Sequence, residues 1–252
     1  MAAWFINLFI PLNFGFSASG MAFSHTERMW AAASLFVFIL SIFIIIKYKT
    51  LPRKHIIPAV ILGVLAGLIN PPAGVVTAAG YVAAQMIFSR QSSKIVMVRS
   101  SSLGQLFLSV GIGLSAGSVL GAVNIVMAVT AGMEPVSTAI FPAIIAAFNP
   151  GIYEEVSFRF FIFAFCLFLI NQVKTRSEKI ICLGIAVIPH VLLHLPDVLL
   201  EQGIGAFFQS FVYLSLLFGL PLAFLQLKRD LLSALTAHYV IVFLRFSVFG
   251  VG

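Results

Sequence analysis

Two adjacent glutamates and an arginine interrupt an apolar stretch of this sequence. Glu154 and Glu155 are followed by Arg159 within residues 151–170, a run long enough to span a lipid bilayer. An ionised group near the centre of a membrane helix costs about 2.5–3.5 kcal/mol, so these groups need a function or a compensating partner. On a helix Glu155 and Arg159 share a face, whereas Glu154 points to a neighbouring face. We therefore expect Arg159 to pair with Glu155 and to leave Glu154 free to act.

Three histidines complete the set of residues that could do chemistry. His190, His194 and Asp197 form a polar stripe on one predicted helix, and His238 lies on the last helix. His194 and Glu154 are equally far from the loop between their helices, so a hairpin places them at the same depth. A carboxylate beside neutral imidazoles in a water-poor cavity can deprotonate water, and an imidazole N–H can stabilise the oxyanion that forms at a carbonyl. These residues predict a hydrolytic site within the membrane.

A metal site is the alternative chemistry for the same residues. His190 and His194 have the i, i+4 spacing that binds zinc, with Glu154 as a third ligand or as the base. No acid lies between the two histidines, so the usual His-Glu-x-x-His pattern is missing and metal-free catalysis without a cofactor is favoured. Considered alone, Glu155 with Arg159 is more typical of a structural ion pair than of a catalytic site. Considered alone, His190 and His194 are more typical of residues that form hydrogen bonds between helices than of metal ligands.

The composition is typical of an integral membrane protein. Of the 252 residues 61% are apolar and 9% charged, and the mean hydropathy is +1.10. We predict one all-α domain over residues 1–252, a polytopic integral membrane helical bundle of about seven to nine transmembrane helices. The net charge of +7 would suggest nucleic acid in a soluble protein. Here the basic residues cluster between apolar runs, so topology and anionic lipid headgroups explain them better and no nucleic-acid partner is expected.

The predicted helices follow from the apolar runs. The strongest spans are residues 30–46, 103–130, 151–170, 180–200, 206–227 and 231–252. Residues 56–88 are broken by Asn70-Pro71-Pro72, which predicts a hairpin of two short helices or one kinked helix. Residues 136–148 end at Asn149-Pro150-Gly151 and suggest a half-span that leads into the acidic helix. Residues 1–20 predict a first membrane segment rather than a cleaved signal peptide.

The basic loops predict an orientation in the membrane. The loops richest in lysine and arginine are residues 47–54, 90–99, 174–179 and 228–229. All four can be placed on the cytoplasmic side, and residues 201–205, on the opposite side, hold no basic residue. The small size and the short loops suggest a prokaryotic plasma membrane.

Small residues predict how the helices pack. Gly113, Gly117 and Gly121 repeat at four-residue spacing, which favours close packing against a neighbouring helix over the lining of a pore. Cys166 and Cys182 stand isolated in apolar stretches, so we expect small buried hydrophobes rather than a disulfide.

The order of the polar motifs resembles that of one protease family. The run Glu154-Glu155-Val156-Ser157-Phe158-Arg159 is similar to the Glu-Glu-x-x-x-Arg signature of the CAAX protease and bacteriocin-processing (CPBP, or Abi) family of intramembrane glutamic proteases. His194, in His194-Leu195-Pro196-Asp197, is similar to the second motif of that family, and His238 stands where the third motif has a histidine. The resemblance covers residues 151–252, a predicted four-helix core, whereas residues 1–150 match only as membrane spans.

This resemblance implies a role for each residue. Glu154, with His194 as its partner, would activate water. His238 would support the oxyanion, and Glu155 with Arg159 would form a structural pair. The implied function is that of an intramembrane endopeptidase acting on a membrane-associated peptide or protein, such as a prenylated CAAX tail or a bacteriocin leader. The expected partners are this substrate and the bilayer, and the sequence assigns no oligomeric state.

Two positions depart from the family pattern and leave other functions open. His190 replaces a phenylalanine, and Val242 replaces a polar residue, often asparagine, that supports the oxyanion. Because loss of one oxyanion donor costs about 2.7–4 kcal/mol in known enzymes, a catalytically inactive family member that binds membrane partners is the alternative. A proton-coupled transporter built on broken helices is a further alternative, and the lack of an internal repeat argues against it.

Overall fold

All regular structure is helical in the part of the chain that the computed structural model describes, namely residues 24–50, 53–91, 95–100, 102–136, 139–170 and 175–251. The helices of the first half are α2 (His25–Tyr48), η1 (Arg53–His55), α3 (Ile56–Ala66), α4 (Pro71–Phe88) and α5 (Leu103–Thr130). Those of the second half are α6 (Ile140–Glu154), η2 (Glu155–Phe160), α7 (Phe161–Ile170), α8 (Arg176–Leu192), η3 (Val198–Gln202), α9 (Gly203–Leu214), η4 (Ser215–Gly219), α10 (Leu220–Lys228) and α11 (Leu231–Phe249). The predicted all-α fold is confirmed for these residues.

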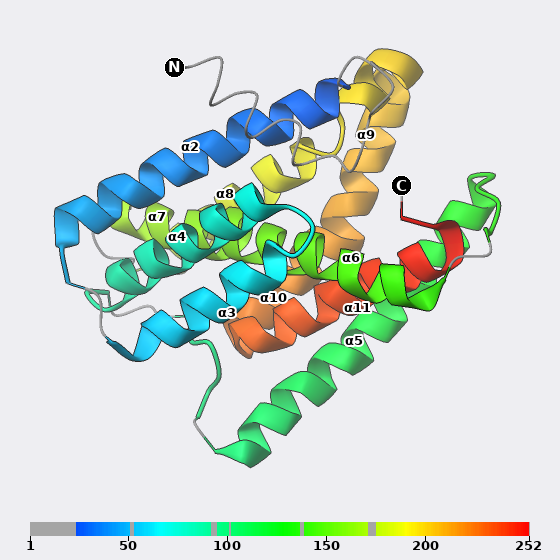
Figure 1. Cartoon of the computed structure of the whole chain (residues 1–252). Helices are drawn as coiled ribbons and strands as arrows, with labels where there is room; N and C mark the ends of the chain where they lie inside the picture. The colour runs from blue at the N-terminus through cyan, green and yellow to red at the C-terminus, as the bar shows by residue number, and fades with distance from the viewer. Residues whose placement is uncertain are drawn as a thin grey trace.

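One long helical run, α6 to α7, passes through the middle of the molecule (Figure 1). The predicted helix boundary at Asn149-Pro150-Gly151 is wrong, because Pro150 lies inside α6, which leads into the acidic segment without a break. Asn149 instead donates a side-chain hydrogen bond to the carbonyl oxygen of Ala66, at 2.8 Å. The six residues of η2 adopt the wider π-helical turn, which places Glu155 to Phe160 in the interior.

Residues 56–88 form the predicted hairpin of two short helices. Asn70 caps α4, and its side-chain oxygen accepts a hydrogen bond from the backbone N–H of Ala73 at 3.3 Å. Pro71 and Pro72 occupy the first helical turn, where a proline ring is compatible with the helix. Both prolines therefore start a helix rather than kink one.

The glycine repeat packs against another helix, as predicted. Gly113, Gly117 and Gly121 are buried on α5, and α11 is the helix that they contact. A Cβ atom added at Gly117 would lie 2.6 Å from the carbonyl oxygen of Ala237, so only glycine allows this approach. The start of α11 is fixed by Asp230, whose carboxylate accepts a hydrogen bond from the Ser109 hydroxyl of α5 at 2.7 Å.

The predicted helix over residues 180–200 is wrong at its end. Helix α8 stops at Leu192, and His194 lies in the following turn, because Pro196 disfavours helical geometry in the residue before it. Asp197 therefore does not lie on the same helix face as His190 and His194, contrary to the prediction, and it caps the start of α2 instead. Its carboxylate accepts hydrogen bonds from the backbone N–H groups of His25 and Thr26 at 2.9 and 3.2 Å.

Four helical segments among the described residues are long and apolar enough to cross a membrane: α2, α5, the run Val198–Lys228 and α11. Their outer faces carry exposed apolar side chains such as Phe107, which is 70% exposed. The first predicted segment, residues 1–20, lies outside the described residues. Cys166 and Cys182 are buried as predicted, but they are not isolated from each other, because their sulfur atoms are 2.7 Å apart across α7 and α8.

Candidate functional site

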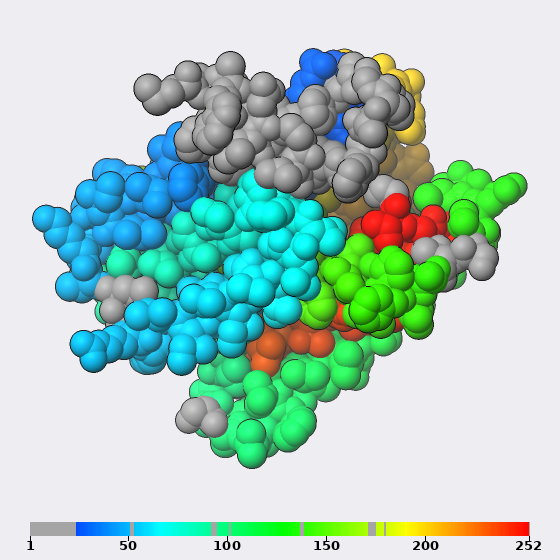
Figure 2. Space-filling model, viewed as in Figure 1, coloured from blue at the N-terminus to red at the C-terminus, as the bar shows by residue number. Residues whose placement is uncertain are grey.

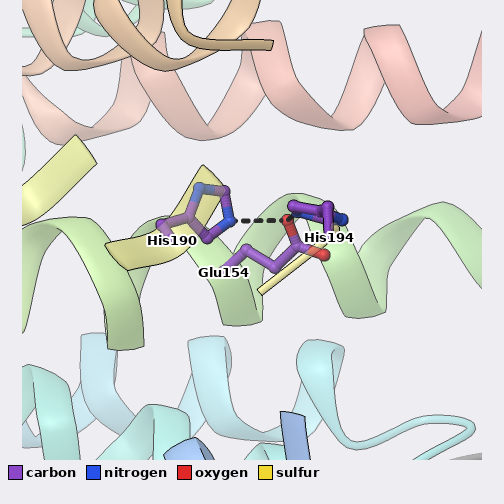
Figure 3. Close-up of side chains that lie close together, drawn as sticks. All are labelled: Glu154, His190 and His194. Carbon is purple, nitrogen blue, oxygen red and sulfur yellow. Dashed lines mark hydrogen bonds and ion pairs between the residues drawn. The ribbon is translucent and has the colours of Figure 1, made fainter. Parts of the chain in front are cut away.

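Six residues singled out in the sequence come together around one carboxylate. They lie at the end of α6 (Glu154), in η2 (Glu155 and Arg159), at the end of α8 (His190), in the turn after α8 (His194) and on α11 (His238). All are buried except His194, whose side chain is 36% exposed. Figure 3 shows the Glu154 carboxylate between the imidazoles of His190 and His194.

The Glu154 carboxylate faces three imidazole nitrogens. Its Oε2 atom is 2.9 Å from Nε2 of His190, 3.6 Å from Nε2 of His194 and 3.7 Å from Nε2 of His238. The predicted equal depth of Glu154 and His194 is therefore confirmed. His190, the residue that departs from the family pattern, is nearer to Glu154 than His194 is.

Glu155 and Arg159 form the predicted ion pair. Both side chains are buried, and the guanidinium of Arg159 contacts Oε1 of Glu155. The same oxygen lies 2.8 Å from Nδ1 of His238, so the pair also contacts α11. Because a buried charge is costly without a partner, this pairing compensates both groups.

Arg159 fixes the tautomer of His190. Its Nη2 atom lies 3.0 Å from Nδ1 of His190. A guanidinium has only donors, so Nδ1 accepts this hydrogen bond and the ring proton of the neutral imidazole is on Nε2. That N–H donates to the carboxylate of Glu154. His190 therefore connects Arg159 to Glu154 through two hydrogen bonds.

This tautomer argues against zinc at the same place. The ligand atoms of Glu154, His190 and His194 lie within 4.8 Å of one another, a spacing that could hold a metal ion. A ligating histidine needs a lone pair on the nitrogen that faces the metal, and it usually donates its other N–H to a carboxylate or carbonyl. His190 accepts a hydrogen bond at that other nitrogen, so these side chains fit a metal ion poorly.

Glu155 fixes the opposite tautomer in His238. An ionised carboxylate accepts hydrogen bonds only, so Nδ1 of His238 carries the proton and donates to Glu155. The lone pair at Nε2 then faces Glu154. A carboxylate that orients an imidazole in this way is the arrangement in which histidine acts as a base. In this tautomer His238 accepts a proton, whereas the family resemblance implies that it supports an oxyanion.

A cavity of about 390 Å³ adjoins the carboxylate and reveals residues that the sequence analysis missed. Its wall includes Glu154 and the three histidines, together with Asn124 of α5 and Val242 and Arg245 of α11. Val242 thus lies beside the site, as the family position implies. Asn124 and Arg245 are polar residues within apolar helices, and this pattern is the sequence signal that could have identified them.

Helix α2 covers the histidines from the other side. The indole of Trp30 packs edge-on against the rings of His190 and His194, with centroids 5.7 and 5.0 Å away. It also contacts Phe158 edge-on, at 5.0 Å. Because Asp197 caps the start of α2, the turn that carries His194 also anchors the helix that covers it. An aromatic residue on an apolar helix gives no sequence signal for this role.

Comparison of the chain with protein-family models, with curated proteins and with solved structures finds no match. The resemblance to the CPBP family therefore depends on the motif residues around Glu154, His194 and His238, and membership of that family stays a prediction.

Proposed function

We propose that the protein is a multi-pass integral membrane endopeptidase of the CPBP type, which hydrolyses a peptide bond in a membrane-associated protein or peptide. One observation carries the proposal: Oε2 of Glu154 lies within 3.7 Å of three imidazole nitrogens at the wall of a cavity. The exposed apolar faces of the long helices support the multi-pass membrane location, and a prokaryotic plasma membrane is part of the same proposal.

Glu154 acts as the base in the proposed mechanism. A water molecule in the cavity transfers a proton to the free oxygen of Glu154 while its own oxygen bonds to the substrate carbonyl carbon. His194, which has the most exposed of the three imidazoles, orients this water from the cavity side. The C–N bond then breaks, and the amine leaves with a proton from Glu154. The lone pair of His238 takes the remaining proton of the attacking water.

The oxyanion needs a donor, and Val242 cannot supply one. Asn124 and Arg245 lie in the wall of the same cavity and carry N–H groups. In this proposal they stabilise the charge that develops on the carbonyl oxygen. The apolar side chain at Val242 is also the observation that favours the second candidate, a membrane protein on the same fold that binds partners without cleaving them.

Cells that carry the wild type, Glu154→Gln, His194→Ala or Glu201→Gln test the proposal. Glu201 is an exposed acid outside the site, so Glu201→Gln is the matched control for the loss of one carboxylate. Peptide termini are compared across the proteome at equal membrane levels of the four proteins. Termini that vanish in Glu154→Gln and His194→Ala, but persist in Glu201→Gln, support proteolysis and identify the substrate. Identical termini in all four strains contradict it and favour the partner-binding candidate.

A further inference from the structure

A second cavity lies beside the first basic loop, and it shares no described lining residue with the cavity at Glu154. Its volume is about 530 Å³. The walls come from η1, α3, the second half of α4 and residues 95–100. Two backbone hydrogen bonds tie this last segment to the start of α11. The carbonyl oxygens of Val96 and Met97 accept from the N–H groups of Leu231 and Leu232 at 2.9 and 3.0 Å.

The polar groups of this cavity suit an anion. Lys54 supplies a positive charge, His55 an imidazole, and Ser89 and Ser100 hydroxyl groups. None of the lining residues within the described ranges is acidic. Burial, and then the charge of Lys54, lower the pKa of His55, so this imidazole is neutral near pH 7 and Lys54 carries the charge.

A buried hydroxyl lines the same cavity. Tyr81 is fully buried, and its Oη atom lies near the side chain of Gln85, which also lines the cavity, but no well-formed hydrogen bond joins it to a residue that the structure describes. The ring is held in place by stacking on Phe160, with centroids 5.7 Å apart, and by an edge contact with His55 at 6.2 Å. A buried polar atom without a partner is destabilising, and a bound ligand is one way to satisfy it.

The helix beside the cavity carries an exposed apolar face. Lys54 and His55 directly precede α3, which lies at the surface of the molecule (Figure 2). Apolar side chains on α3 are exposed, among them Ile57 at 71%. A cationic, hydroxyl-rich cavity beside an apolar outer face matches an amphipathic anion, with a charged head and an apolar tail.

We propose that this cavity binds the phosphate group of an anionic phospholipid, with Lys54 as its charge partner and the Tyr81 hydroxyl as a hydrogen-bond donor. The acyl chains then lie along the exposed face of α3. Basic pockets at the membrane surface are typical sites for such headgroups. This inference rests on the membrane location proposed above and is independent of the peptidase activity.

Lipid binding by the purified full-length protein tests the proposal. The probes are dioctanoyl phosphatidylglycerol, the zwitterionic dioctanoyl phosphatidylcholine and inorganic phosphate, each titrated in a neutral detergent. Native mass spectrometry measures stoichiometry and affinity. We expect one bound phosphatidylglycerol per chain, weaker binding of phosphatidylcholine, and no displacement by inorganic phosphate. Displacement by inorganic phosphate, or equal affinity for both lipids, would overturn the assignment to an anionic lipid.

Three variants locate the binding site. Lys54→Gln removes the charge, and Tyr81→Phe removes only the hydroxyl while the ring can still stack on Phe160. Lys47→Gln is the control, because Lys47 is an exposed cation in the last turn of α2 and does not line the cavity. We expect Lys54→Gln to weaken binding of phosphatidylglycerol about tenfold, Tyr81→Phe to weaken it less, and Lys47→Gln to leave it unchanged. Wild-type affinity in both cavity variants would exclude this cavity, whether or not the protein is a peptidase.

Discussion

His190 shows how one side chain can connect a structural ion pair to a candidate base. Its two ring nitrogens contact Arg159 and Glu154, at 3.0 and 2.9 Å. A phenylalanine at this position, as the family pattern has, would leave Arg159 and Glu154 without that connection. His190 thus provides hydrogen bonds where a phenylalanine would provide only an apolar contact, and these bonds fix the orientation of the Glu154 carboxylate.

His190→Phe should destabilise the protein while it keeps the ring contacts with Trp30 and Phe158. The change leaves a buried guanidinium N–H and a carboxylate oxygen without their partner, which costs about 1–3 kcal/mol. Thermal unfolding in detergent measures the loss. His194→Phe is the control, because that imidazole is more exposed and lies farther from Glu154. Equal losses in the two variants would contradict the connection through His190.

Asn124→Ala should slow hydrolysis if its amide stabilises the oxyanion. Loss of one such donor lowers kcat about 10²–10³-fold in known enzymes. Ser115→Ala on the same helix is the control, since Ser115 is exposed and does not line the cavity. Val242→Asn supplies the amide that the family position has and should restore part of the rate in an Asn124→Ala background. Cleavage of the substrate by purified protein measures both effects, and unchanged kcat in Asn124→Ala would remove Asn124 from the mechanism.

Most helices could be predicted from the sequence because they coincide with apolar runs of sufficient length. Residues 103–130 coincide with α5, and the break at Asn70-Pro71-Pro72 coincides with the start of α4. The two wrongly predicted helix boundaries both lie near a proline, whose effect depends on the helices packed around it. Pro150 is accepted within a long buried helix, whereas Pro196 contributes to a real end of α8. Hydropathy does not distinguish these cases, because tertiary packing decides between them.

Gly117→Leu should separate α5 from α11 and destabilise the protein. A side chain at this position meets the backbone of Ala237, and overpacking of this kind costs about 1–3 kcal/mol. Gly111→Leu is the matched control, because no atom lies within 4 Å of a Cβ added there. The unfolding temperature in detergent measures both, and equal stability of the two variants would contradict the close packing.

The composition of the whole molecule indicated its class, but could not reveal which segments meet. Counting residues from a loop predicted that Glu154 and His194 lie at one depth, and the order of the motifs in the resembled family associated His238 with them. Trp30 and Asn124 could not be assigned to the candidate site from the sequence, because nothing in the sequence relates α2 and α5 to the last hundred residues. These contacts depend on how the helices cross, and the crossings follow from packing over the whole chain.

The proposed orientation predicts which loops can be labelled from outside the cell. Cysteine introduced at Glu201 should react with a membrane-impermeant maleimide in intact cells, whereas cysteine at Lys49 should react only after lysis. Both positions are exposed, and the native cysteines Cys166 and Cys182 are buried, so the background is low. Labelling in the reverse pattern would invert the topology, and labelling of both in intact cells would contradict the multi-pass arrangement.

The contact of Trp30 with His190 and His194 gives the protein an intrinsic optical probe. The chain has two tryptophans, so the substitution Trp4→Phe leaves Trp30 as the single indole. Both imidazole rings lie edge-on to Trp30, so its fluorescence is sensitive to any movement of these rings. The change of its emission in detergent on mixing with a peptide therefore reports occupancy of the neighbouring cavity, without a label and before any bond is broken.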